Sequence, residues 1–221
     1  MAATGTEEET LVWKLEAGRV LTLPDGRSLR LGDVIRVEFE EPTEMGGAGG
    51  GVEADLWVAE ERLDFVLFPG SKAEVTEAWD DRYRYVLEDA WDGTADLRIF
   101  ERTAEVVPGS VQRVHFDLEE AQPIAPGIWM TVQRHTHKDP PAGHPGALVV
   151  YVRYHGKPEV TEQGSSYRLL DEASYTLSAA EAHPIWIWRD LRFTVEASEY
   201  GKSVDLRIER LRLDPVPPPS R

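Results

Sequence analysis

The sequence contains no cysteine. The chain therefore cannot form disulfides, bind metals through thiolates or use a thiol as a nucleophile or redox switch. Its stability must come from buried apolar side chains, and 221 residues are enough to build such a core.

Long apolar runs are also absent. Nowhere do 18 apolar residues occur together, and the first ten residues, MAATGTEEET, lack the basic region and apolar run of a secretion signal. We therefore expect a soluble, cytoplasmic protein that does not enter a membrane.

Positive charge is scarce, with 24 Lys and Arg against 40 Asp and Glu, a net charge of −16. Because each phosphate contact needs a cation, this balance argues against binding nucleic acid or an anionic membrane surface. Acidity keeps a protein soluble, and it also suits a basic partner or mimicry of a nucleic acid.

Sequence motifs of catalysis are missing as well. The chain has no G-x-S-x-G, no H-E-x-x-H and no glycine-rich phosphate loop placed before a helix. Paired carboxylates of the glycosidase type have no fixed sequence spacing, so the question of an enzyme stays open. We favour a non-catalytic role.

The apolar residues that are present alternate with polar ones in short runs about ten residues apart, broken by Gly and Pro. This pattern predicts an all-β protein of antiparallel sandwich or barrel type. A helical turn fits only within 169–182. We expect residues 1–10 to be disordered, the glycine-rich stretch 41–53 to be a flexible loop and the Pro-rich tail 215–221 to be extended and exposed.

An internal duplication is suggested by Arg84–Arg102, RYVLEDAWDGTADLRIFER, which resembles Arg192–Arg210, RFTVEASEYGKSVDLRIER. A second match precedes each copy, with Glu74–Glu77 and Glu159–Glu162 both reading EVTE. Two matches in the same order favour duplication over chance resemblance between charged strands. We predict two tandem β units, 11–107 and 111–214; one large jelly-roll-like sandwich is the alternative.

Both copies have the pattern of β-hairpins. In the first, a three-residue loop, 92–94, would place Leu87 opposite Ile99 and keep one face apolar, whereas a two-residue loop would not. In the second, a two-residue loop at 200–201 places Val195 opposite Leu206 and Phe193 opposite Ile208.

The histidines of one loop are the best candidates for metal ligands. His135 and His137 lie two residues apart, so on a strand they face the same way, and Asp139 or His144 could complete a divalent metal site. The alternative is a mobile polar loop that happens to carry histidines. A weaker calcium candidate is the carboxylate series Asp80, Asp81, Asp89, Asp92 and Asp96, which also suits ordinary turns.

Trp186 and Trp188 share one face of a predicted strand, and Ile185 and Ile187 share the other. One of these faces is expected to be partly exposed, and an exposed aromatic pair would suit a partner's pocket or a sugar ring. The alternative is that both faces are covered. We thus favour an interaction or assembly module that binds a protein partner or its own copies. A metal- or ligand-binding protein, or an enzyme, with its site at the His135–His144 loop is the second hypothesis.

Overall fold

β-strands account for nearly all regular structure in the computed structural model, which describes residues 11–38, 50–67, 76–134, 147–155, 159–161, 164–166, 169–178, 184–199 and 202–219. The strands form antiparallel sheets, which confirms the predicted all-β class. Residues 169–178 form strand β15, so the helical alternative for that segment is wrong. Within the described ranges no helix is long and apolar enough to cross a membrane.

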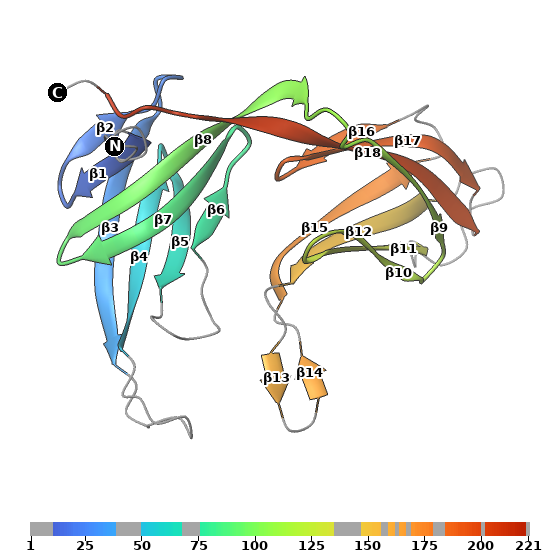
Figure 1. The fold of residues 1–221 in the computed structure, drawn as a ribbon, viewed down its shortest axis with the longest axis horizontal. Coiled ribbons are helices and arrows are strands. Elements are labelled where there is room, and N and C mark those ends of the chain that lie inside the picture. Colours follow the sequence, from blue (N-terminus) through green and yellow to red (C-terminus); the bar gives the residue numbers. More distant parts are fainter. Residues whose placement is uncertain are drawn as a thin grey trace, which may run out of the picture. The chain divides into compact units, whose positions relative to one another are not determined.

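The chain divides into two compact units (Figure 1). Unit 1 comprises residues 1–103 and 213–221, and unit 2 comprises residues 104–212.

Unit 1 contains two antiparallel sheets. One has the strand order β6-β7-β8-β1 and the other β2-β3-β4-β5. The strands are β1 (Val12–Glu16), β2 (Val20–Thr22), β3 (Ser28–Glu38), β4 (Gly50–Val58), β5 (Glu61–Leu67), β6 (Glu77–Trp79), β7 (Tyr83–Trp91) and β8 (Thr94–Val106).

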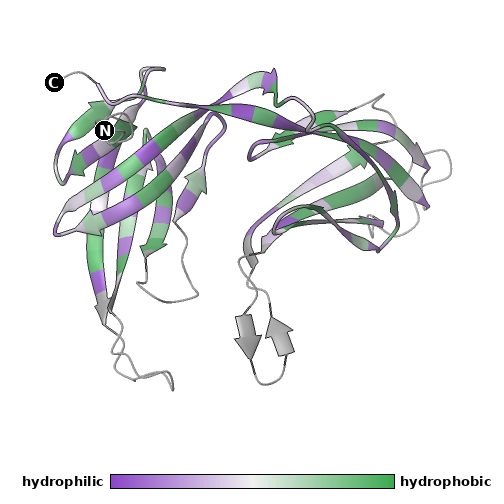
Figure 2. Ribbon diagram, in the orientation of Figure 1, coloured by the Kyte–Doolittle hydropathy of each residue, from purple (hydrophilic) through white to green (hydrophobic). Residues whose placement is uncertain are grey.

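Alternation along these strands builds one core between the two sheets. In β8, for example, Ala95, Leu97 and Ile99 are buried, while the residues between them are not. Trp13 of β1 and Phe65 of β5 are each 1% exposed and belong to the same cluster, so both sheets contribute to it. Figure 2 shows the corresponding alternation of apolar and polar residues along the strands.

Unit 2 has sheets with the orders β9-β18-β17-β16 and β10-β11-β12-β15. The strands are β9 (Gln112–Asp117), β10 (Ala121–Ala125), β11 (Ile128–Arg134), β12 (Ala147–His155), β13 (Glu159–Thr161), β14 (Gly164–Ser166), β15 (Leu169–Ser178), β16 (Ile185–Trp188), β17 (Leu191–Glu199) and β18 (Ser203–Pro215). A second core, which includes Phe116, Met130 and Phe193, lies between these sheets.

The two units share one strand order, once the β13-β14 hairpin between β12 and β15 is set aside. β1 to β5 then correspond to β9 to β12 and β15, and β6 to β8 correspond to β16 to β18. Side-chain pairs follow the same correspondence. Lys14 lies opposite Asp96 at 3.7 Å in unit 1, and His115 lies opposite Asp205 at 2.6 Å in unit 2.

One sequence match does not follow this correspondence. Glu77 begins β6, whereas Glu159–Thr161 forms β13, which has no counterpart among the described strands of unit 1. The EVTE repeat is therefore not a match between equivalent strands.

The first hairpin turns in a different way from our prediction. Trp91 pairs with Thr94, so the loop has two residues, Asp92 and Gly93, with φ angles of 43° and 79°. Two positive φ angles are the conformation of a type I′ turn, which Asp-Gly favours. The predicted three-residue loop, with Leu87 opposite Ile99, is wrong.

A β-bulge restores the apolar face that the loop alone would disrupt. The register shifts at Glu88, and Leu87 then pairs with Leu97. In the second hairpin Val195 pairs with Leu206 and Phe193 with Ile208, as predicted.

The second hairpin carries the same bulge. The register shifts at Glu196, and the ladder ends at Glu199 opposite Ser203. The connection is therefore one residue longer than the two-residue loop that we predicted at 200–201, and those two residues lie outside the described part.

Two chain segments depart from the expected loop and tail. β4 begins at Gly50, and Gly51 pairs with Val37, so the end of the glycine-rich stretch belongs to a strand. In the expected tail, Val216 is only 4% exposed. Its N–H donates to the Ile99 carbonyl and its carbonyl accepts from the Trp13 indole, both at 2.8 Å, so this segment completes unit 1.

Candidate interaction edge

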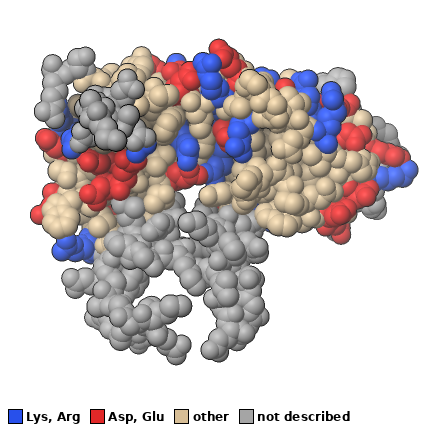
Figure 3. Space-filling view, in the orientation of Figure 1, with Lys and Arg blue, Asp and Glu red and all other residues tan. Residues whose placement is uncertain are grey.

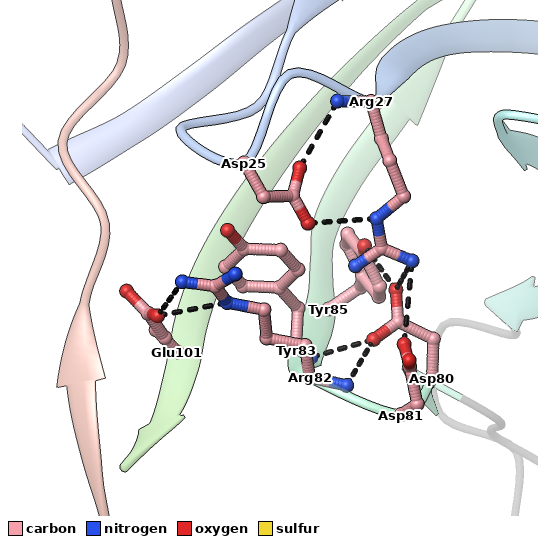
Figure 4. Close-up of polar contacts among 8 residues, drawn as sticks. All are labelled: Asp25, Arg27, Asp80, Asp81, Arg82, Tyr83, Tyr85 and Glu101. Atoms are coloured by element: carbon pink, nitrogen blue, oxygen red, sulfur yellow. Dashed lines mark hydrogen bonds and ion pairs between the residues drawn. The ribbon is translucent and has the colours of Figure 1, made fainter.

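A dense group of polar contacts lies in unit 1 around Asp80 (Figure 4). The Asp80 side chain is fully buried and accepts hydrogen bonds from the N–H groups of Arg82 and Tyr83 at 2.7 and 2.6 Å. The Tyr85 hydroxyl donates to it at 2.7 Å, and the Arg27 guanidinium lies 3.1 Å away.

Tyr85 and Arg27 both keep their protons beside Asp80. Burial and the hydrogen bond to Asp80 raise the pKa of Tyr85, so its hydroxyl stays a donor. Burial opposes the charge of Arg27, but its hydrogen bond to Asp25 and the charge of Asp80 outweigh this and raise its pKa. The Asp80 carboxylate, with these four groups around it, closes the loop before β7 and is not available as a base or a metal ligand.

The calcium candidates do not gather around Asp80, and Asp89 and Asp96 lie opposite one another in the ladder between β7 and β8. Asp80 is occupied by the donors just named, the Asp81 side chain is 88% exposed, and Asp92 forms the type I′ turn. Across the described ranges, no group of three His, Asp or Glu residues could hold a metal ion. His135, His137, Asp139 and His144 lie outside the described residues, so the metal site proposed there stays a prediction.

The predicted aromatic pair lies in β16 of unit 2. Trp186 stacks between Tyr175 and Phe193, with ring centroids 4.6 and 4.9 Å away and interplanar angles of 5° and 12°. Both faces of the Trp186 ring are thus covered. Trp188 is half-buried and packs against the same core, with the Arg189 guanidinium near its ring. A partner contact through either tryptophan stays a prediction.

The exposed side chains of β16 are the two isoleucines on its outer face. Ile185 is 60% exposed and Ile187 is 45% exposed. β16 is the last strand of its sheet, since it pairs with β17 and with no other described strand. It therefore presents an uncharged, aliphatic surface next to a free backbone edge.

The equivalent edge of unit 1 is built differently. Register places Glu77 of β6 where unit 2 has Ile185, because Tyr85 lies opposite Ala78 and Phe193 lies opposite Trp186. Glu77 forms an ion pair with Arg84 at 2.5 Å. A charged side chain on an edge strand discourages another strand from pairing there.

In unit 2 the corresponding charges lie one strand further in. Arg192, the counterpart of Arg84, donates to Glu209 of β18 at 2.8 Å instead of reaching the edge. The hydrogen bond from Arg192 lowers the pKa of Glu209 more than burial raises it, so this pair stays charged and mutually neutralised. Among the described residues, no charged side chain of β16 guards its edge.

Alternation in the sequence separates the two faces of β16 but does not show which one is exposed. The residues opposite them on β17 distinguish the two faces. The tryptophans share a face with Leu191 and Phe193, which belong to the core, whereas the isoleucines share a face with Arg192 and Thr194.

Charge is unevenly divided between the units. Unit 1 has 12 Lys and Arg and 25 Asp and Glu, a formal net charge of −13, and unit 2 has 12 and 15, a net charge of −3. In the view of Figure 3, the basic side chains lie beside acidic ones and form no separate patch. This face therefore presents no basic stripe of the kind that follows a phosphate backbone.

No family model matches the chain, and comparisons with curated proteins and with solved structures find no match either.

Proposed function

We propose that the chain is a non-catalytic interaction module that binds an extended segment of a protein partner along the free edge of β16. In this mode of recognition the partner's backbone adds a strand to the sheet, and side chains on the two faces give specificity. The observation that carries the proposal is the replacement of the edge charge of Glu77 by the exposed Ile185 at the equivalent position.

The shared strand order, the equivalent bulges at Glu88 and Glu196, and the matched ion pairs support an origin of the two units by duplication. After a duplication, one copy can keep a protected edge while the other acquires a contact surface. The unequal edges of β6 and β16 fit that division of roles.

Both faces of an added strand would meet apolar groups. On the outer face it would cover Ile185 and Ile187, and on the inner face it would lie beside Trp186. Complete burial of an isoleucine contributes about 1.5–3 kcal/mol, and these two are already partly covered, so the side chains add a few kcal/mol at most. We therefore expect binding that is specific but reversible.

The test is to give β16 the charge that β6 carries, with Ile185→Glu. Protein purified from its own source, or incubated with an extract of that source and cross-linked, should retain its partner in the wild type and lose it in the variant. Val20→Glu is the matched control, because Val20 is also 60% exposed but lies on β2 of unit 1. The proposal is wrong if Ile185→Glu folds normally and keeps the same partners as the wild type.

A further inference from the structure

One hydrogen bond at the start of β16 shows which of its backbone N–H and C=O groups face β17. The Val195 N–H donates to the Pro184 carbonyl at 3.1 Å. Antiparallel ladders alternate, so Pro184, Trp186 and Trp188 turn their backbone groups toward β17. The N–H and C=O groups of Ile185 and Ile187 therefore point to the free edge.

This alternation limits how β16 can pair with a second copy of itself. Residues directly opposite one another in an antiparallel pair lie on the same face of the sheet. A two-fold axis beside Trp186 places Ile185 opposite Ile187 of the second copy, and Ile187 opposite its Ile185. Both pairs have outward-pointing backbone groups, so each exchanges two hydrogen bonds.

Other self-pairing registers are poorer. An axis beside Ile187 would place Ile185 opposite Arg189, which lies in the turn with a φ angle of 55° and cannot extend the ladder. Two identical edge strands that are related by a two-fold axis perpendicular to the sheet run antiparallel, so parallel pairing does not give a closed dimer. The alternation of isoleucine and tryptophan in β16 thus makes the described strand self-complementary about Trp186.

Charge also favours a second copy over an oppositely charged partner. β16 carries no charged side chain, and Arg192 behind it is neutralised by Glu209. Unit 2 has a net charge of only −3, against −13 for unit 1, so two β16 edges can approach without the repulsion that two copies of unit 1 would experience. A basic partner would find its complement on unit 1 instead.

We propose that β16 pairs antiparallel with β16 of a second copy of this chain, around a two-fold axis at Trp186. The inference rests on the function proposed above and names the partner of that site. A strand of four residues buries less than the roughly 1,200 Å² of a stable interface, so the dimer dissociates on dilution.

The first experiment is sedimentation equilibrium of the full chain over a wide concentration range. The weight-average mass of the wild type should rise from 24.9 kDa toward twice that value as concentration increases. Ile185→Glu should stay at the monomer mass, and Val20→Glu should behave as the wild type does. A wild-type mass that does not change with concentration overturns the inference.

The second experiment tests the register, and the absence of cysteine makes it clean. Ile185→Cys and Ile187→Cys variants are oxidised separately and as a mixture. The mixture should form a covalent dimer faster than either variant alone, because only the 185–187 pair lies within the Cα separation that a disulfide spans. Cross-linking no faster than that of Val20→Cys contradicts the register.

The two proposals fail separately. If the wild type stays monomeric while Ile185→Glu still loses a different protein, self-pairing is wrong and strand addition at β16 stands. If Ile185→Glu changes neither the mass nor the bound partners, both proposals are wrong.

Discussion

At the scale of single residues, Asp80 fixes the connection between β6 and β7 by accepting hydrogen bonds from two backbone N–H groups and one hydroxyl. It also lies 3.1 Å from Arg27, which comes from the turn between β2 and β3. The side chain thereby joins the two sheets of unit 1 at one end.

Asp80→Asn should destabilise unit 1. The amide keeps an acceptor for the backbone N–H groups but loses the negative charge that faces Arg27. Because Arg27 is partly exposed and keeps its contact with Asp25, we expect a loss of about 2–3 kcal/mol in the free energy of unfolding, measured with denaturant.

Asp81→Asn is the control for this substitution, because the Asp81 side chain is 88% exposed. Its free energy of unfolding should stay within about 0.5 kcal/mol of the wild type. Equal stability of the two variants would show that the Asp80 contacts do not contribute to the fold.

The role of Asp80 could not be predicted from the sequence. It follows a strand and precedes another aspartate, which suits a turn or a calcium ligand equally. What decides between them is that Arg27, 53 positions earlier, and Tyr85 reach the same carboxylate, and this depends on how β2, β3, β6 and β7 come together.

At the scale of elements, the two β-bulges determine which side chains of β7 and β17 face the core. The buried set in β7 is Tyr83, Tyr85 and Leu87 before the bulge and Ala90 after it. Because the bulge at Glu88 takes one residue out of the alternation of inward and outward side chains, the hairpin combines a tight Asp-Gly turn with a continuous apolar face.

Deleting Glu88 should leave the core face of the hairpin intact, because Glu88 is the residue that the bulge takes out of the ladder. Asp89 stays opposite Asp96 and Leu87 stays opposite Leu97, so Leu87 and Ala90 still face the core of unit 1. We expect unit 1 to keep its cooperative unfolding, measured by circular dichroism during thermal denaturation.

A deletion elsewhere in β7 is the contrasting variant. Without Val86, either Tyr85 lies opposite Arg98 or Glu88 lies opposite Leu97, so a charged side chain turns toward the core. This variant should lose the cooperative unfolding of unit 1. Equal cooperativity of the two deletion variants would show that register does not decide the stability of the hairpin.

The bulges explain why strand positions were predictable and loop lengths were not. Alternation predicted the strands, and it predicted the pairing of Val195 with Leu206 correctly. Alternation predicted the wrong loop in the first hairpin, because one extra residue keeps the apolar side chains on one face whether it lies in the loop or in the strand. Only the positive φ of both Asp92 and Gly93 distinguishes them.

At the scale of the whole molecule, the chain passes from unit 1 to unit 2 after residue 103 and returns after residue 212. The returning segment is rich in proline, which is why it was expected to be an exposed tail. Composition shows that such a segment forms no helix, but it does not show whether the segment packs against a core.

Truncation after Asp214 should weaken unit 1 specifically. The cut removes buried Val216 and its hydrogen bonds with Ile99 and Trp13, for an expected loss of about 2–4 kcal/mol. Hydrogen exchange should accelerate in β1 and β8 while the core strands of unit 2 keep their protection.

Truncation after Pro217 is the matched control, because it shortens the chain but keeps Val216. It should leave exchange in both units unchanged. Faster exchange throughout unit 2 in the variant truncated after Asp214 would mean that the returning segment stabilises the whole chain and not unit 1 alone.

The position of Val216 also has a consequence for synthesis on the ribosome. In most multidomain chains the N-terminal domain is complete first and can fold while the rest is translated. Here the first unit contains a residue made after all of unit 2, so Trp13 waits for its hydrogen-bond partner until translation has passed residue 216. The unit that begins first is therefore finished last, and unit 2 can fold while the core of unit 1 is still incomplete.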